Sequence, residues 1–505
     1  MRGRADAPSK TASVASVPAD TNVPDRCLLL PSAIACALVL ARSLIFLCYE
    51  QSFFDSDQAI VGLMAKHLVE GRAFPLFYYG QAYMLVVDAW VAAPIFLVMG
   101  PTVTALHTAL VLMNMAAAVL LIRCLVRWGG VTPMQALGAV VFFAFAPPLT
   151  SASLIEAGAN IGPFLYVPLL WMLRRRPLWF GLVLGIGFLN REFTIYAVVA
   201  LLGVELLQGA LQCEERRRFW LVAMVATLAT WQVLQALQPY SDMMGPGTRG
   251  QLIRGFADSQ VGNIMDRIAV TPAELPARAQ AMFTRHLPEL WGAQRRVDVI
   301  STQGHAWLFW PLLGGLTLAL LRAGILLRAP GAFTRSLFGW YLIAVGILAA
   351  GGYIATRPAE DVVYRYILLT MLLPVGIAAV WLALEPKAAL RYVAAAGLAV
   401  WMAGSAIDHA AQVSRYWGGR EPNEPRDLAD GLVARGIRTA QAGYWRAYKV
   451  TFLAREQVKI ASTDMVRIDE YQRTAAATAR LLTITEEPCA GAEKVSLWYL
   501  CPPAE

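Results

Sequence analysis

Long apolar runs separated by short polar segments dominate the chain. Each run holds roughly 20 residues, the length at which a helix crosses the hydrocarbon core of a bilayer. The pattern predicts a polytopic α-helical membrane protein with about 11 transmembrane helices. The expected spans are 27–49, 103–122, 134–150, 159–173, 178–189, 193–209, 219–238, 305–327, 336–356, 366–384 and 392–408.

Basic residues recur in alternate loops between these runs, and the short loops between them carry almost none. Because cytoplasmic loops are rich in Lys and Arg, this alternation predicts a multi-pass protein of the bacterial inner (cytoplasmic) membrane, with the N-terminus inside and the C-terminus outside. The same residues account for the net charge of +8, so we expect no nucleic-acid partner. They are Arg123, Arg127, Arg174, Arg175, Arg176, Arg216, Arg217, Arg218, Arg322, Arg328, Arg335, Lys387 and Arg391.

The run 178–209 has two interpretations, because Asn190, Arg191 and Glu192 interrupt it. A single span would place these polar groups in hydrocarbon, at a cost of roughly 2.5–3.5 kcal/mol for each charge. It would also reverse the charge pattern of every later loop. We therefore predict two short spans that meet outside.

The remaining segments define the domains. Residues 1–26 are polar and basic, which predicts a disordered cytoplasmic tail. A cleaved signal peptide is the alternative, but the first apolar run exceeds the roughly 7–15 residues of a signal sequence and favours a retained anchor. Residues 27–408 form the membrane module, with external loops at 50–102 and 239–304, the first carrying amphipathic helices on the membrane surface. Residues 409–505 are expected to form a small periplasmic α/β domain, with a helix at GYWRAYKVTFLARE and strands at VKIAST and VSLWYL.

Composition and cysteine use agree with this assignment. Hydrophobic residues make up 57% of the chain and charged residues 15%, whereas a soluble protein carries about 25% charged residues. The seven cysteines show no metal-ligand spacing. Cys489 and Cys501 fall in the predicted external domain, where an oxidising compartment favours a disulfide between them.

The first external loop carries the candidate chemistry. Asp55 and Asp57 follow the first span, an aromatic segment FYYGQAY comes next, and Asp88 follows it. Paired acids at a membrane surface can act as a general base or hold a cation. Asp is also a good N-cap, so one of the pair could simply begin the following helix.

The loop resembles that of the membrane-embedded glycosyltransferases called GT-C, and is most similar to the aminoarabinose transferase and protein O-mannosyltransferase family. The matching pieces are FFDSDQAIVGLMAKHLVEGRAFPLFYYGQAYM and DAWVAAPIFLVMGP. FLNRE at 188–192 and RPAEDVVYRYILLTMLLP at 357–374 add to the likeness. The resemblance extends loosely over most of residues 27–408.

This resemblance implies an inverting sugar transfer at the outer face of the membrane. The donor would be a polyprenyl-phosphate-linked sugar, and the acceptor a hydroxyl of a glycan, lipid or protein. Asp55 matches the leading acid of the family and is the candidate base, with Asp57 as the second catalytic candidate. No cofactor is required; if a divalent cation is used, both acids would hold it.

Further residues are candidates for binding the two substrates. For the donor phosphate they are Arg191, Arg357, Tyr364 and Arg365; for other substrate contacts they are His67, Gln81, Tyr83 and Asp88. Each has a structural alternative. Arg191 could form a salt bridge with Glu192 or Glu156, Arg357 and Arg365 could snorkel, the tyrosines could form an interfacial belt, and His67 could be a solvated surface residue.

Two other function classes remain open from the sequence. A transporter or flippase of lipid-linked glycans would favour polar groups in mid-span and a repeated half, and neither is evident. A non-catalytic assembly protein with a binding domain outside is the third hypothesis. The sequence does not specify the sugar or the acceptor.

Overall fold

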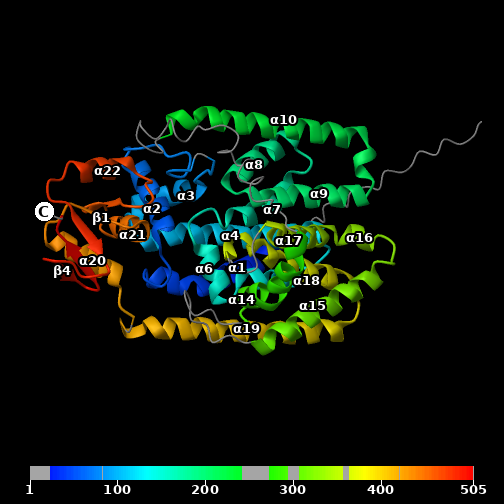
Figure 1. Ribbon diagram of the computed structural model, residues 1–505. Helices are drawn as coiled ribbons and strands as arrows, with labels where there is room; N and C mark the ends of the chain where they lie inside the picture. Colours follow the sequence, from blue (N-terminus) through cyan, green and yellow to red (C-terminus); the bar gives the residue numbers. More distant parts are fainter. Residues whose placement is uncertain are drawn as a thin grey trace, which may run out of the picture.

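The computed structural model describes residues 23–81, 83–241, 272–293, 306–356, 363–419 and 421–503. Long helices run roughly parallel to one another, and the C-terminal residues form a lobe at one end of them (Figure 1). The α-helices are α1 (Arg26–Cys48), α2 (Ser56–Val69), α3 (Val87–Met99), α4 (Val103–Trp128), α5 (Pro133–Ala144), α6 (Pro148–Ile155), α7 (Gly162–Leu173), α8 (Pro177–Asn190), α9 (Ile195–Leu207), α10 (Glu214–Leu237), α13 (Leu275–Ala281), α14 (Leu287–Leu290), α15 (Ala306–Leu326), α16 (Ala332–Arg335), α17 (Leu337–Thr356), α18 (Leu372–Leu384), α19 (Ala388–Tyr416), α20 (Glu424–Ala434), α21 (Tyr444–Leu453) and α22 (Asp469–Ala476).

The apolar helices make this a polytopic membrane protein. Within the described residues, six helices are long and apolar enough to cross a bilayer, namely α1, α4, α10, α15, α17 and α19. The pair α5 and α6 would add a seventh span if counted as one, although its two halves are bent by 84°. The shorter α7 and α8 also coincide with predicted spans, and the total of about 11 stays a prediction.

The first external region differs from the amphipathic surface helices predicted for it. Nearly every residue of α2 is buried, from Ser56 to His67, because α3 covers one side of the helix and α21 another (Figure 1). Only the end of α3 exposes large apolar side chains, at Leu97, Val98 and Met99. The sequence pattern of α2 predicts a helix that lies between lipid and water, whereas α21, from a distant part of the chain, packs on it.

The C-terminal lobe is built on a five-stranded sheet with the order β2-β1-β3-β5-β4. The strands are β1 (Thr439–Ala442), β2 (Lys459–Ser462), β3 (Leu482–Thr485), β4 (Glu493–Val495) and β5 (Trp498–Cys501). Strands β1, β2 and β3 are parallel, while β5 runs antiparallel to both β3 and β4. Helices α21 and α22 connect the parallel strands, so the carboxyl ends of β1, β2 and β3 share one edge of the sheet. Cys489 and Cys501 form a disulfide beside this edge.

Two connections fix the lobe to the helices. The long α19 leads into it, and α21 packs directly on α2 (Figure 1). At this contact the Ser56 hydroxyl donates a hydrogen bond to the Tyr444 carbonyl oxygen over 2.7 Å. The buried Phe452 ring lies so close to Gly62 that a Cβ atom there would be 2.6 Å from it. The lobe is therefore held against the loop that carries the two candidate acids.

Candidate active site

The beginning of α2 positions the two acids of the first external loop. Asp55 is the N-cap residue, and its Oδ1 accepts a hydrogen bond from the Gln58 backbone N–H over 3.0 Å. One oxygen of Asp55 thus caps the helix, as the capping alternative predicted. The cap does not use the second oxygen, which could accept a proton. Burial raises the pKa of Asp55, the Gln58 N–H opposes this, and the neighbouring Asp57 adds to it.

Asp57 is held from two directions. The Tyr444 hydroxyl of the C-terminal lobe donates a hydrogen bond to Asp57 Oδ1. Arg365 Nη1 lies 3.7 Å from Asp57 Oδ2. A carboxylate fixed in this way is less free than Asp55 to accept a proton from a substrate, since both of its oxygens already have partners.

Glu156 is a third acid at the same place, and we did not predict it as a site residue. It follows α6 directly, and its Oε1 lies 3.6 Å from the same Arg365 Nη1. Burial, together with the nearby Asp55, raises the pKa of Glu156 to about 7. One guanidinium therefore faces two carboxyl groups, with Asp55 close by. The sequence signal was a single acid among the apolar and small residues of LTSASLIEAGAN.

Asp88 has a positioning role in the structure. Its side chain is 1% exposed, and Oδ2 accepts hydrogen bonds from the backbone N–H groups of Gly158 (2.9 Å) and Ala159 (2.7 Å). These two residues adopt positive φ angles in the loop after Glu156. Asp88 thus holds the loop that carries Glu156 and is closed off from solvent, whereas we predicted a direct substrate contact.

Arg191 lies at the C-terminal end of α8, with its guanidinium over the rings of Phe193 and Tyr366, at 5.5 and 5.7 Å from their centres. Its Nη1 donates to the Met84 sulfur over 3.5 Å. The side chain is 8% exposed, and among the described residues neither Nε nor Nη2 has a hydrogen-bond partner. The charge of Arg191 also acts on the carboxyl groups of Glu156 and Asp88. The salt-bridge alternative stays a prediction.

The other predicted donor residues are only partly placed. Arg365 lies in a short 3-10 helix, η7 (Tyr364–Tyr366), and reaches Asp57 and Glu156 as given above. Tyr364 is buried beside it. Arg357 lies outside the described residues.

The aromatic segment forms a tight loop near the end of α8. The Gln81 N–H donates to the Tyr78 carbonyl, and the Tyr78 N–H donates to the Met84 carbonyl, both over 2.8 Å. Gln81 and Tyr83 are half-buried. The Leu85 N–H bonds to the Leu189 carbonyl, which fixes this loop beside Arg191.

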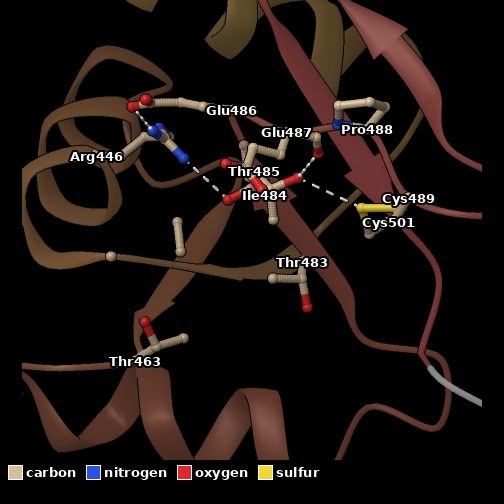
Figure 2. Close-up of a pocket in the computed structure, with 12 residues that line it drawn as sticks. Arg446, Thr463, Thr483, Ile484, Thr485, Glu486, Glu487, Pro488, Cys489 and Cys501 are labelled. Carbon is tan, nitrogen blue, oxygen red and sulfur yellow. Dashed lines mark hydrogen bonds and ion pairs between the residues drawn. A yellow bond between two sulfur atoms is a disulfide. The ribbon is translucent and has the colours of Figure 1, made fainter.

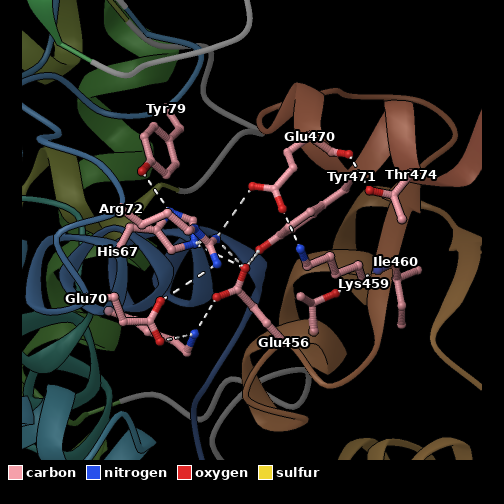
Figure 3. A network of polar contacts seen from close by, with 12 residues as sticks. His67, Glu70, Arg72, Tyr79, Glu456, Lys459, Ile460, Glu470, Tyr471 and Thr474 are labelled. Atoms are coloured by element: carbon pink, nitrogen blue, oxygen red, sulfur yellow. Dashed lines mark hydrogen bonds and ion pairs between the residues drawn. The ribbon is translucent and has the colours of Figure 1, made fainter. Parts of the chain in front are cut away.

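His67 belongs to a different cluster, shown in Figure 3. Its ring is 3% exposed, with Nδ1 2.8 Å from the Tyr79 hydroxyl and Nε2 3.2 Å from Glu456 Oε1. Glu456 also accepts from Lys66 (2.6 Å) and from the Tyr471 hydroxyl (2.7 Å). Although burial opposes it, hydrogen bonds from these partners hold the pKa of Glu456 well below its usual range. His67 therefore joins α2 to the C-terminal lobe, and the solvated alternative is wrong.

The C-terminal lobe contributes residues to the site that no sequence pattern indicated. Besides Tyr444, the side chain of Lys449 on α21 lies near Asp55, Glu50 and Glu424, although burial still lowers the pKa of Lys449. Arg467 lies over the rings of Tyr78 and Tyr444, at 5.7 Å from each, and donates to the Gly80 carbonyl over 3.1 Å. These contacts connect residues almost 400 positions apart, such as Tyr444 and Asp57 at a separation of 387.

The described residues contain no group of three or more His, Cys, Asp and Glu side chains that could hold a metal ion. A divalent cation at Asp55 and Asp57 stays a prediction. Asp55, Arg365 and Arg191 all lie within electrostatic reach of Glu156. Two guanidinium nitrogens of Arg191 have no hydrogen-bond partner among the described residues.

Comparisons with known proteins support the fold. No protein-family model matches the sequence, and no curated protein gives a significant match. The crystal structure of ArnT from Cupriavidus metallidurans bound to undecaprenyl phosphate covers 95% of this chain and 98% of its own, with 10% sequence identity and a TM-score of 0.55.

Two further solved structures are less similar to this chain. The apo structure of the same ArnT gives a TM-score of 0.45 at 11% identity, covering 94% of this chain and 97% of its own. The arabinofuranosyltransferase AftD from Mycobacteria gives 0.39 at 16% identity, covering 85% of this chain and 30% of its own. The chain shares its fold with ArnT bound to undecaprenyl phosphate, in agreement with the resemblance of the first external loop to the aminoarabinose transferase family.

Proposed function

We propose that this chain, which shares its fold with an aminoarabinose transferase, is a glycosyltransferase that uses a polyprenyl-phosphate-linked sugar as donor. The observation that carries the proposal is the meeting of Asp55, Glu156, Arg365 and Arg191 at one end of the helices, where a lipid phosphate would meet water. The matching ArnT structure holds undecaprenyl phosphate, which supports a donor of this class.

The reaction is a single displacement with inversion. The acceptor hydroxyl gives its proton to Asp55 while its oxygen forms a bond to the anomeric carbon. The bond between that carbon and the phosphate oxygen breaks, and polyprenyl phosphate leaves with the electron pair. Such a base contributes roughly 10²–10⁴-fold to the rate. The raised pKa of Asp55 suits this role, because a more basic carboxylate takes a proton more readily.

Arg191 is proposed to stabilise the leaving phosphate. Two of its three guanidinium nitrogens have no hydrogen-bond partner among the described residues, and the flanking rings of Phe193 and Tyr366 keep the group in place. Charge on the phosphate oxygen grows as the glycosidic bond breaks, so a fixed cation lowers the barrier more than it tightens ground-state binding. Arg365, already shared by Asp57 and Glu156, is proposed to assist from the other side.

The site is proposed to face the outer side of the inner membrane, with the N-terminus inside and the C-terminus outside. A membrane-impermeant thiol reagent tests this in intact cells, using single cysteines in a variant that lacks the five free cysteines Cys27, Cys36, Cys48, Cys124 and Cys213. Arg480→Cys in the C-terminal lobe should be labelled and Arg217→Cys protected. Labelling of Arg217→Cys with protection of Arg480→Cys would invert the orientation.

A reconstitution experiment tests the function and separates it from the flippase alternative. The purified protein is placed in liposomes with undecaprenyl-phosphate sugars radiolabelled in the sugar, and an envelope lipid and glycan extract is the acceptor. We expect label to move into the extract with release of undecaprenyl phosphate. Label that crosses the bilayer while still attached to its lipid would indicate transport and overturn the proposal.

A further inference from the structure

Two adjoining hollows lie on the C-terminal lobe, and one of them is lined by Tyr444 and Lys449 of the candidate site. The first, here called the aromatic groove, has a volume of about 320 Å³ and is lined by Pro425, Leu428, Tyr444, Trp445, Lys449 and Trp498, among others. The second, the threonine pocket, holds about 580 Å³ and is lined by Thr463, Thr483 and Thr485 beside the disulfide. Gly443, Arg446 and Glu486 line both, so the two hollows adjoin.

The aromatic groove shares two residues with the surroundings of the candidate acids. Tyr444 and Lys449 line it, and the same two residues approach Asp57 and Asp55 from the C-terminal lobe. Arg191 and Arg365 reach the site from elements of the membrane module. The groove therefore adjoins residues that approach the acids, and an acceptor bound there would come close to the proposed base.

The groove walls suit a sugar ring. Trp445 is 62% exposed although it is a large apolar residue, and Trp498 offers a second ring, stacked on the Arg446 guanidinium at 3.7 Å. Exposed aromatic faces beside a few polar groups are typical of binding sites for small ligands. The polar groups here are Lys449 and the Arg446–Glu486 ion pair at 2.6 Å.

The threonine pocket continues the same surface at the carboxyl ends of the parallel strands, where ligands of α/β sheets commonly bind. Figure 2 shows Thr463, Thr483 and Thr485 around it, with Arg446 and Glu486 at its border. Hydroxyl groups both donate and accept hydrogen bonds, as sugar hydroxyls do. A chain of sugars could thus extend from the aromatic groove into this pocket.

The charges argue against a lipid headgroup or another anion as occupant. Two cations line the hollows, Arg446 and Lys449, against the three acids Asp464, Glu486 and Glu487. A surface that recognises anionic lipid carries an excess of Lys and Arg. A ligand with many hydroxyls and little charge fits better.

We propose that the aromatic groove and the threonine pocket together bind the acceptor, and that the acceptor is a glycan chain. This inference rests on the proposed transferase function and specifies its second substrate. The terminal sugar would stack on Trp445 with a hydroxyl directed at Asp55, and the preceding sugars would occupy the threonine pocket.

Binding of the full-length protein in detergent to a printed panel of neutral and acidic oligosaccharides tests this inference. We expect at least one neutral oligosaccharide to bind, and Trp445→Ala to weaken that binding about tenfold through loss of the stacking face. Trp417→Ala is the matched control, because Trp417 is 69% exposed at the end of α19 and outside both hollows.

Three outcomes would overturn the inference: no oligosaccharide binds, Trp445→Ala binds as well as the parent, or Trp445→Ala instead lowers association with phosphatidylglycerol vesicles. The last would make Trp445 a membrane anchor. The panel measures binding alone and needs no turnover. If oligosaccharides bind through Trp445 but no sugar is transferred, the glycan-binding groove is supported and the transferase function is wrong. If sugar is transferred without such binding, the transferase function is supported and the groove is not the acceptor site.

Discussion

At the scale of single residues, Glu156 and Asp55 form a linked pair of acids. Burial, together with the nearby Asp55, raises the pKa of Glu156 to about 7, so Glu156 is expected to hold its proton below that pH. Above it, a second anion develops beside the place proposed for the donor phosphate. The pair thus resembles other sites in which environment separates the roles of two carboxyl groups.

Glu156→Gln is expected to remove the alkaline loss of activity. In the parent, transfer should decline as pH rises through about 7, and the variant, which cannot ionise there, should stay active. Stability gives an independent readout. The unfolded carboxyl ionises near 4.5 and the folded one near 7, so the parent should lose stability between these values and the variant should not.

Activity and thermal unfolding across pH 5–9 would measure both effects of Glu156→Gln. Glu214→Gln, in an exposed pair with Arg218, serves as the control and should change neither profile. If the activity of Glu156→Gln still declined as pH rises, the decline would belong to another titrating group.

Arg191 provides the second prediction at this scale. Arg191→Ala should lower kcat about 10²-fold, the typical cost of removing one preorganised donor to developing charge. Arg191→Lys keeps the charge but loses the planar fork, so a smaller defect is expected. Turnover and binding of undecaprenyl phosphate by the purified protein would be measured, with the exposed Arg218→Ala as control. Loss of thermal stability with normal turnover in the folded fraction would show that Arg191 is only a packing residue.

At the scale of elements, the contact between α2 and α21 holds the site together. Ser56, Gly62 and Phe452 make this contact, and Tyr444 and Lys449 reach the acids only while it is intact. The fully buried character of α2 follows from it. Local patterns could not predict this, because the covering helix begins almost 400 positions later.

Gly62→Ala tests this interface. A Cβ at Gly62 would lie 2.6 Å from the buried Phe452 ring, so α21 must shift and activity should fall together with stability. Gly203→Ala is the control: it also lies in a helix, and a Cβ there meets nothing within 4 Å. That change should leave activity intact and stabilise by up to about 1 kcal/mol. Thermal unfolding and turnover distinguish the two, and rescue of Gly62→Ala by Phe452→Leu would confirm the clash as cause.

At the scale of the whole molecule, the sequence correctly predicted a polytopic helical membrane protein, because apolar runs of roughly 20 residues are typical of membrane-spanning helices. The number of spans stays a prediction, and the expected span 134–150 contains the 84° bend between α5 and α6. The sequence also indicated Asp55 as a candidate, because an acid at the membrane surface can act as a general base or hold a cation. A strand and helix alternation in the last hundred residues indicated an α/β unit, and the structure has one there.

The rest of the site depends on contacts that no local pattern records. Glu156 was visible only as an acid in a small-residue segment, and Tyr444 and Lys449 looked like ordinary residues of an amphipathic helix. Asp88 and His67 were predicted to contact substrate, whereas their partners in the structure are backbone N–H groups and Glu456. A buried polar residue signals a specific partner without identifying it.

The most direct test of the account compares Asp55→Asn and Asp57→Asn in liposomes that contain the labelled undecaprenyl-phosphate sugars and the envelope extract. If Asp55 is the base, Asp55→Asn should transfer sugar at least about 10²-fold more slowly while still binding undecaprenyl phosphate. Asp57→Asn should keep more activity, since Asp57 is already held by Tyr444. Normal transfer by Asp55→Asn, with the loss in Asp57→Asn instead, would contradict the central claim.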